Sequence, residues 1–75
     1  MLEQLREVAG MGGPAASLAN ELLVLNEQYT TGNLSKEEYQ YLVQQIGEVR
    51  ASQELASDEQ ACRFIVNAAQ MIFMV

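Results

Sequence analysis

The stretch GNLSKEEY, residues 32–39, decides the fold of this chain. Gly32 suits the left-handed residue that ends a helix. Ser35, followed three residues later by Glu38, forms the capping-box pattern that starts the next helix. Because the connection is so short, the helices on its two sides should be antiparallel neighbours. The sequence therefore predicts a helical hairpin centred on this turn.

The two helices of the hairpin are expected at residues 15–31 and 35–55. In both segments apolar residues recur at spacings of three and four, as in a helix that packs along another helix. Gly47 lies inside the second helix at a cost of about 1 kcal/mol relative to alanine, and it either permits close approach of another backbone or is incidental. The residues expected to pack the hairpin are Leu18, Leu22, Leu25, Tyr29, Tyr39, Leu42, Ile46 and Val49.

A short amphipathic helix is predicted at residues 1–9, with Leu2 and Leu5 on its apolar face. A helix of this length is marginal alone in water, so it should dock on the rest of the chain or on a partner. Residues 10–14, GMGGP, form a linker that ends this helix and starts the next. A phosphate-binding loop would need a preceding strand and a lysine at fixed spacing, and both are missing.

The segment at residues 57–75 is expected to be a helix that begins near Ser57 and is apolar on almost every side. A large apolar patch is rarely left uncovered on a soluble monomer. We expect the hairpin to cover one side and a protein partner another, and the pattern leaves open whether the helix folds back or reaches a second chain. The expected partner-interface residues are Phe64, Ile65, Ala68, Met71, Ile72, Phe73 and Val75, joined by Leu2 and Leu5.

Composition limits the classes of function. Seventy-five residues make a single domain, which we expect to be an all-α bundle of three to four helices. Ten acidic residues oppose four scattered basic ones, which argues against direct binding of nucleic acid. The acidic groups either keep an apolar protein soluble or, as a weaker alternative, imitate a phosphate backbone.

The residue types present give little support for metal binding, cofactor binding or nucleophilic catalysis. Histidine is absent and Cys62 is the single cysteine, so we expect no metal site, no cofactor and no catalytic residues. Arg63 beside Cys62 could activate the thiol, but a small buried thiol is the commoner outcome in an apolar run. The first residues lack the pattern of a signal peptide, so we expect a cytoplasmic protein or one assembled into a virion, not a secreted one.

Residues 22–46, LLVLNEQYTTGNLSKEEYQYLVQQI, resemble the SHOCT module, a short helical hairpin. The matching features are a leucine-rich helix with an aromatic residue, a glycine turn, and an apolar-Ser-x-Glu-Glu-aromatic start to the second helix. The resemblance covers about a third of the chain and implies a hairpin used for oligomerisation or as an adaptor, without catalytic residues. The chain departs from the module in two ways, because some thirty residues follow the hairpin and Gln44 and Gln45 stand where lysines are usual.

Three hypotheses of function follow. The first is a structural or assembly subunit, present in several copies or inside a large complex and, by analogy, an accessory protein of a phage particle. The second is a small acidic inhibitor or adaptor that binds a groove on a host enzyme. The third, membrane association, is disfavoured because residues 61–75 would span about 22 Å, against a hydrocarbon core of roughly 30 Å.

Overall fold

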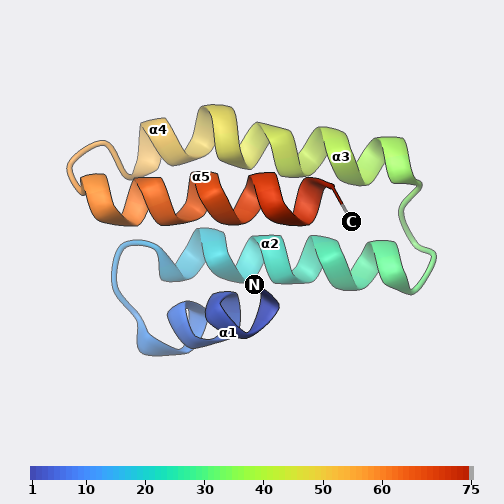
Figure 1. The fold of residues 1–75 in the computed structure, drawn as a ribbon, viewed down its shortest axis with the longest axis horizontal. Helices are drawn as coiled ribbons and strands as arrows, with labels where there is room; N and C mark the ends of the chain where they lie inside the picture. Colours follow the sequence, from blue (N-terminus) through green and yellow to red (C-terminus); the bar gives the residue numbers. More distant parts are fainter. Residues whose placement is uncertain (75) are drawn as a thin grey trace.

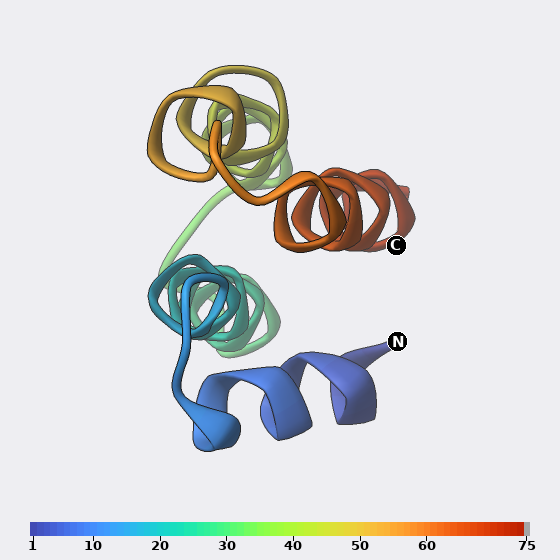
Figure 2. The ribbon, with the colours of Figure 1, turned by 90° about the vertical axis from the view of Figure 1, so that its left-hand side faces the viewer.

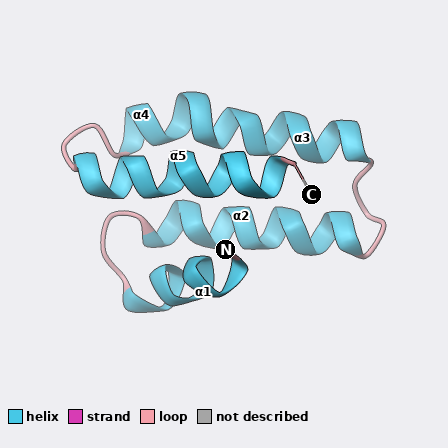
Figure 3. Ribbon diagram, viewed as in Figure 1, coloured by secondary structure: helices cyan, strands magenta, loops and turns pink. Residues whose placement is uncertain are grey.

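The computed structural model describes residues 1–74, and all regular elements in that range are helical. Helices α3 (Lys36–Gln45) and α4 (Ala51–Glu54) continue into one another through a π-helical turn, η1 (Ile46–Arg50), and form one rod (Figures 1 and 3). The prediction of a small all-α bundle is confirmed. The elements are α1 (Leu2–Met11), α2 (Ala16–Thr30), α3 (Lys36–Gln45), η1 (Ile46–Arg50), α4 (Ala51–Glu54) and α5 (Glu59–Phe73).

The rod formed by α3, η1 and α4 lies antiparallel to α2, and α5 packs against both (Figures 1 and 2). The C-terminal helix therefore folds back on its own hairpin and runs in the same direction as α2. Helix α1 packs on α2, on the side away from the rod (Figure 1). This arrangement places the core between α1 and α2 on one side and α5 and the rod on the other.

The turn between α2 and α3 has the predicted capping chemistry. The Ser35 hydroxyl accepts a hydrogen bond from the Glu38 amide at 3.1 Å, and the Glu38 carboxylate accepts one from the Ser35 amide at 2.9 Å. Gly32 has a φ of 85°, the left-handed conformation that glycine adopts at little cost. The capping box is confirmed, and it fixes where α3 starts.

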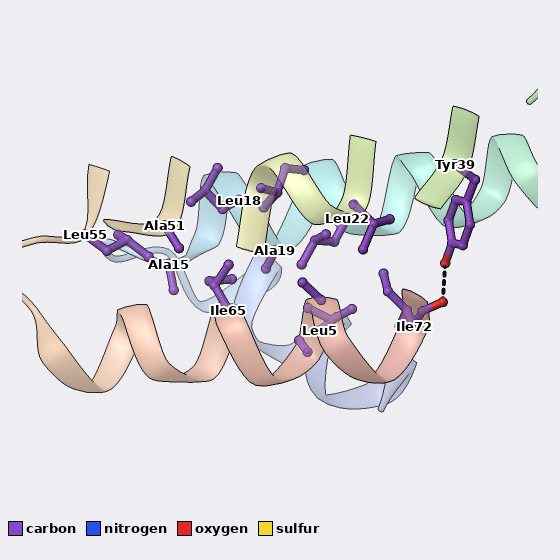
Figure 4. Close-up of a cluster of buried hydrophobic side chains, with 14 residues drawn as sticks. Leu5, Ala15, Leu18, Ala19, Leu22, Tyr39, Ala51, Leu55, Ile65 and Ile72 are labelled. Atoms are coloured by element: carbon purple, nitrogen blue, oxygen red, sulfur yellow. Dashed lines mark hydrogen bonds between the residues drawn. The ribbon is translucent and has the colours of Figure 1, made fainter. Parts of the chain in front are cut away.

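Side chains from every helical segment of residues 1–74 fill the core (Figure 4), mostly leucine, isoleucine and alanine, with Tyr39 and Val43 from α3. Leu5 of α1 is fully buried and points toward the same cluster as Ile65 and Ile72 of α5 (Figure 4). Burial of one such side chain contributes about 1.5–3 kcal/mol. Docking through Leu5 therefore compensates for the low intrinsic stability of a ten-residue helix.

The start of α5 and the end of α1 each differ from the sequence prediction by two residues. Asp58, not Ser57, is the N-cap of α5, since its carboxylate accepts a hydrogen bond from the Ala61 amide at 3.1 Å. Helix α1 continues through Gly10 to Met11 and ends at Gly12, where φ is 75°. The linker is therefore shorter than the predicted residues 10–14.

The second hairpin helix packs with a different periodicity from the one expected. Leu42 and Val49 are 36% and 39% exposed, so their assignment to the hairpin seam was wrong. Apart from Ile46, which is also buried, the buried residues recur at every fourth position: Tyr39, Val43, Gly47, Ala51 and Leu55.

The π-helical turn explains this spacing. In a regular helix with 3.6 residues per turn, residues four apart drift by about 40° per step, so the row would leave the core. In η1 the Ala51 amide bonds the Ile46 carbonyl, five residues back. The turn thus takes in an extra residue and returns Ala51 and Leu55 to the buried side.

Candidate functional site

The structure divides the expected partner-interface residues into two groups. Four of them, Leu5, Ile65, Ala68 and Ile72, lie in the core of this chain, with exposures of 2% or less. The assignment of these four residues to a partner interface is wrong, because they pack on one another and on the hairpin in a single core: Leu5 from α1, the other three from α5. Leu2, Phe64 and Phe73 are half-buried, Met71 is 58% exposed, and Val75 lies outside the described residues.

The expected hairpin residues are also distributed unevenly. Leu18, Leu22, Tyr39 and Ile46 lie in the core, which the structure builds from both helices of the hairpin. Leu25 and Tyr29 are half-buried and pack against it. The sequence prediction missed Val43, which is fully buried, and Asn26, which is 9% exposed. The signal for Asn26 was its position four residues after Leu22, on the same face of α2.

A chain of buried hydrogen bonds fixes the C-terminal end of α5. The Tyr39 hydroxyl donates to the Ile72 carbonyl at 3.0 Å (Figure 4) and accepts a hydrogen bond from the Asn26 side-chain amide at 3.1 Å. Gln40 donates to the Phe73 carbonyl at 3.2 Å. Carbonyls in the last turn of a helix lack intrahelical donors, so these side chains of α3 supply what α5 needs to end there.

The aromatic surroundings of Tyr39 complete this anchor. Its ring stacks on that of Tyr29, with centroids 4.4 Å apart and planes 11° from parallel. Burial raises the pKa of Tyr39, partly offset by the hydrogen bond from Asn26. The phenol therefore stays protonated and able to donate to Ile72. We conclude that Tyr39 has a structural role.

Beside α5, along α3 and η1, runs a groove of about 490 Å³, which we call the η1–α5 groove. Its floor and one wall are apolar, whereas its rim carries two glutamines and one glutamate. Met74 at one end is 83% exposed. The lining residues are Gln44, Gly47, Glu48, Val66, Ala69, Gln70, Phe73 and Met74.

The floor of this groove exists because two very small residues meet there. A Cβ atom placed on Gly47 would lie 2.9 Å from the Ala69 Cβ, closer than real Cβ contacts come. Of the two readings of Gly47 that the sequence allowed, close approach of another backbone is therefore the one observed. The approach of η1 to α5 leaves a floor of small residues beside Val66 and Phe73.

The rim of the η1–α5 groove is negatively charged. Glu48 is the one charged residue among its lining residues, and the Gln44 amide donates to its carboxylate at 3.0 Å. In the described part of the chain, no cation lies within ion-pair distance of Glu48. The last turn of α5 also has no basic side chain to offset the negative end of the helix dipole.

A second, smaller groove of about 260 Å³ runs between α2 and the rod and has a different electrostatic character. There Arg50 forms two hydrogen bonds with the Glu21 carboxylate, one of 2.8 Å, and a third with Glu54, also at 2.8 Å. These carboxylates raise the pKa of Arg50, with Glu21 the larger cause. Because its charges are paired within the chain, this groove offers a partner no free charge.

The described residues hold no arrangement suited to metal binding. Across residues 1–74, no group of three or more Cys, Asp or Glu side chains is placed to hold an ion. Cys62 is half-buried and packs against the core. None of the helices in the same range combines the length and apolar character that a membrane crossing requires.

Comparison of the chain with protein-family models, with curated proteins and with solved structures gives no match.

Proposed function

We propose that this chain is a non-enzymatic assembly or adaptor subunit that holds a segment of another protein in the η1–α5 groove. The observation that carries the proposal is the groove itself: a floor of Gly47 and Ala69, walls of Val66 and Phe73, and the exposed side chain of Met74. A hollow with a mainly apolar lining is typical of interaction sites. Methionine adapts to partners of varied shape because its side chain is unbranched and flexible.

The proposal keeps the part of the sequence-based hypothesis that concerned α5 but changes which face is used. The face with Ile65 and Ile72 is buried against the hairpin, so the flank with Val66, Phe73 and Met74 is the one left for a partner. The resemblance of residues 22–46 to the SHOCT module supports the same role, since that resemblance implies an adaptor or oligomerisation hairpin. A place inside a larger particle, such as a virion, would suit such a subunit.

Selection from a random-peptide display library tests the proposal without knowledge of the natural partner. The affinity of selected peptides would be measured by fluorescence anisotropy against the unmodified chain and against Met74→Gln and Met11→Gln. The two methionines are matched, because Met74 is 83% exposed and Met11, away from the groove, is 80% exposed. The Met74→Gln substitution should weaken binding of the selected peptides about tenfold, which corresponds to about 1.4 kcal/mol.

The Met11→Gln variant should bind the selected peptides as the unmodified chain does. Peptides that bind both variants with equal affinity would show that the η1–α5 groove is not the docking surface. A selection that yields no peptide sensitive to Met74→Gln would also overturn the proposal.

A further inference from the structure

The shape of the η1–α5 groove favours a helix as its occupant. The groove follows two antiparallel helices, so a third helix can lie along it with its side chains between theirs. Gly47 and Ala69 keep the floor low, which lets a third backbone come close. The floor and the α5 wall of the groove are apolar, so the face of the partner helix that enters must be apolar as well.

The charge around the groove favours a cationic occupant. Glu48 lies on the rim with a neutral glutamine as its partner, and the carbonyl end of α5 closes the groove near Phe73 and Met74. Both features present negative charge, and basic side chains are absent from the lining. A lysine or arginine at the edge of the incoming helix would pair with the Glu48 carboxylate, and the negative end of the α5 dipole would add to the attraction.

The net charge of the chain also favours a cationic occupant. The chain carries a formal charge of −6, so it attracts cations over distance and repels a second copy of itself. The smaller groove between α2 and the rod gives an internal comparison, because Arg50 and Glu21 neutralise each other there. Of these two grooves, the η1–α5 groove is the one with a carboxylate in its lining that forms no ion pair within residues 1–74.

We infer that the η1–α5 groove binds a cationic amphipathic helix of a partner protein, with the apolar face on Gly47 and Ala69 and a basic residue at Glu48. This inference rests on the proposed function and specifies the class of partner.

Three designed peptides with one shared apolar face test the inference. The first has lysines on its polar face, the second has glutamates at the same positions, and the third is the lysine peptide with a central proline that prevents a helix. Binding would be followed by amide chemical-shift changes in NMR spectra of the intact chain. The lysine peptide should bind at least tenfold more tightly than either of the others and should shift the amides of Gly47, Glu48 and Met74.

Charge-matched variants separate a local effect of Glu48 from the overall charge. Glu48→Gln and Glu7→Gln each remove one negative charge, and Glu7 is an exposed residue on α1, outside the groove. Glu48→Gln should lower the affinity for the lysine peptide about two- to fivefold, the range of an exposed ion pair. Glu7→Gln should leave that affinity nearly unchanged.

The outcomes distinguish this inference from the proposed function. If the lysine and glutamate peptides bind the groove equally, or if Glu48→Gln and Glu7→Gln behave alike, the cationic partner is wrong while the docking groove stands. If the proline peptide binds as tightly as the lysine peptide, the groove holds an extended segment and the inference of a helix is wrong. If no peptide shifts the groove amides, or if the chain self-associates in a way that Met74→Gln abolishes, the inference also fails. The library selection tests independently whether the η1–α5 groove is a docking site.

Discussion

Replacement of Tyr39 by phenylalanine tests how the C-terminal helix is held. The change keeps the ring and its stacking on Tyr29 but removes the hydroxyl that joins Asn26 to the Ile72 carbonyl. Each of the two hydrogen bonds contributes about 1 kcal/mol, and an unsatisfied buried partner costs about 1–3 kcal/mol. We therefore expect the free energy of unfolding to fall by about 2 kcal/mol.

Urea and thermal unfolding, followed by circular dichroism, measure this loss. For a domain of this size about 2 kcal/mol should lower Tm by about 8–16 °C. Tyr41→Phe is the matched control, since Tyr41 is 62% exposed and its hydroxyl makes no hydrogen bond within the described chain. It should change stability by less than about 0.5 kcal/mol. Equal effects of the two substitutions would refute the claim that the Tyr39 hydroxyl anchors α5.

Three further predictions concern the floor of the groove and the start of α3. Gly47→Ala should lower the free energy of unfolding in urea by about 1 kcal/mol, because steric overlap with Ala69 exceeds the gain in helix propensity. Adding Ala69→Gly should recover part of that loss. Strictly additive effects of the two substitutions would contradict the close contact. Ser35→Ala should cost about 1 kcal/mol, whereas Ser57→Ala, which removes no cap, should change the same unfolding free energy little. The hydrogen bonds from Ser35, the backbone one first, lower the pKa of Glu38 below its ordinary 4.5, so its stabilising contribution is present above that pH and is lost as the pH falls through the lowered value. Acid titration of stability should therefore show a smaller decline for Glu38→Gln, and identical acid profiles would argue against the capping box.

The parts of the fold that the sequence predicts well are those set by local chemistry. Gly32, Ser35 and Glu38 act within a few residues of each other, so the turn and the start of α3 follow from the sequence alone. The start of α5 was harder, because Ser57 and Asp58 are adjacent and both are good caps. Which of the two residues caps α5 depends on the path of the loop after α4, and the local sequence does not determine that path.

The packing of the rod depended on a feature that regular periodicity hides. A spacing of three and four selected Leu42 and Val49, whereas the π-helical turn continues a row with a spacing of four and buries Ala51 and Leu55. A row of apolar or small residues at every fourth position was the available signal.

The candidate site was harder still to predict. Its floor depends on contact between Gly47 and Ala69, which are far apart in the sequence. The exposed flank of α5 became clear only once the position of α5 against the rod was known, because nearly all of its surface is apolar in sequence.

The most direct test of the docking groove uses the methyl groups of the methionines, which can be labelled with carbon-13 and observed one by one. Met74 lies at the η1–α5 groove, Met71 lies on α5 outside the groove lining, and Met11 lies at the end of α1. On titration with a peptide selected for binding, the Met74 methyl signal should shift and saturate while those of Met11 and Met71 stay in place. A saturating shift at Met11 or Met71, with Met74 unchanged, would contradict the assignment of the η1–α5 groove as the docking site.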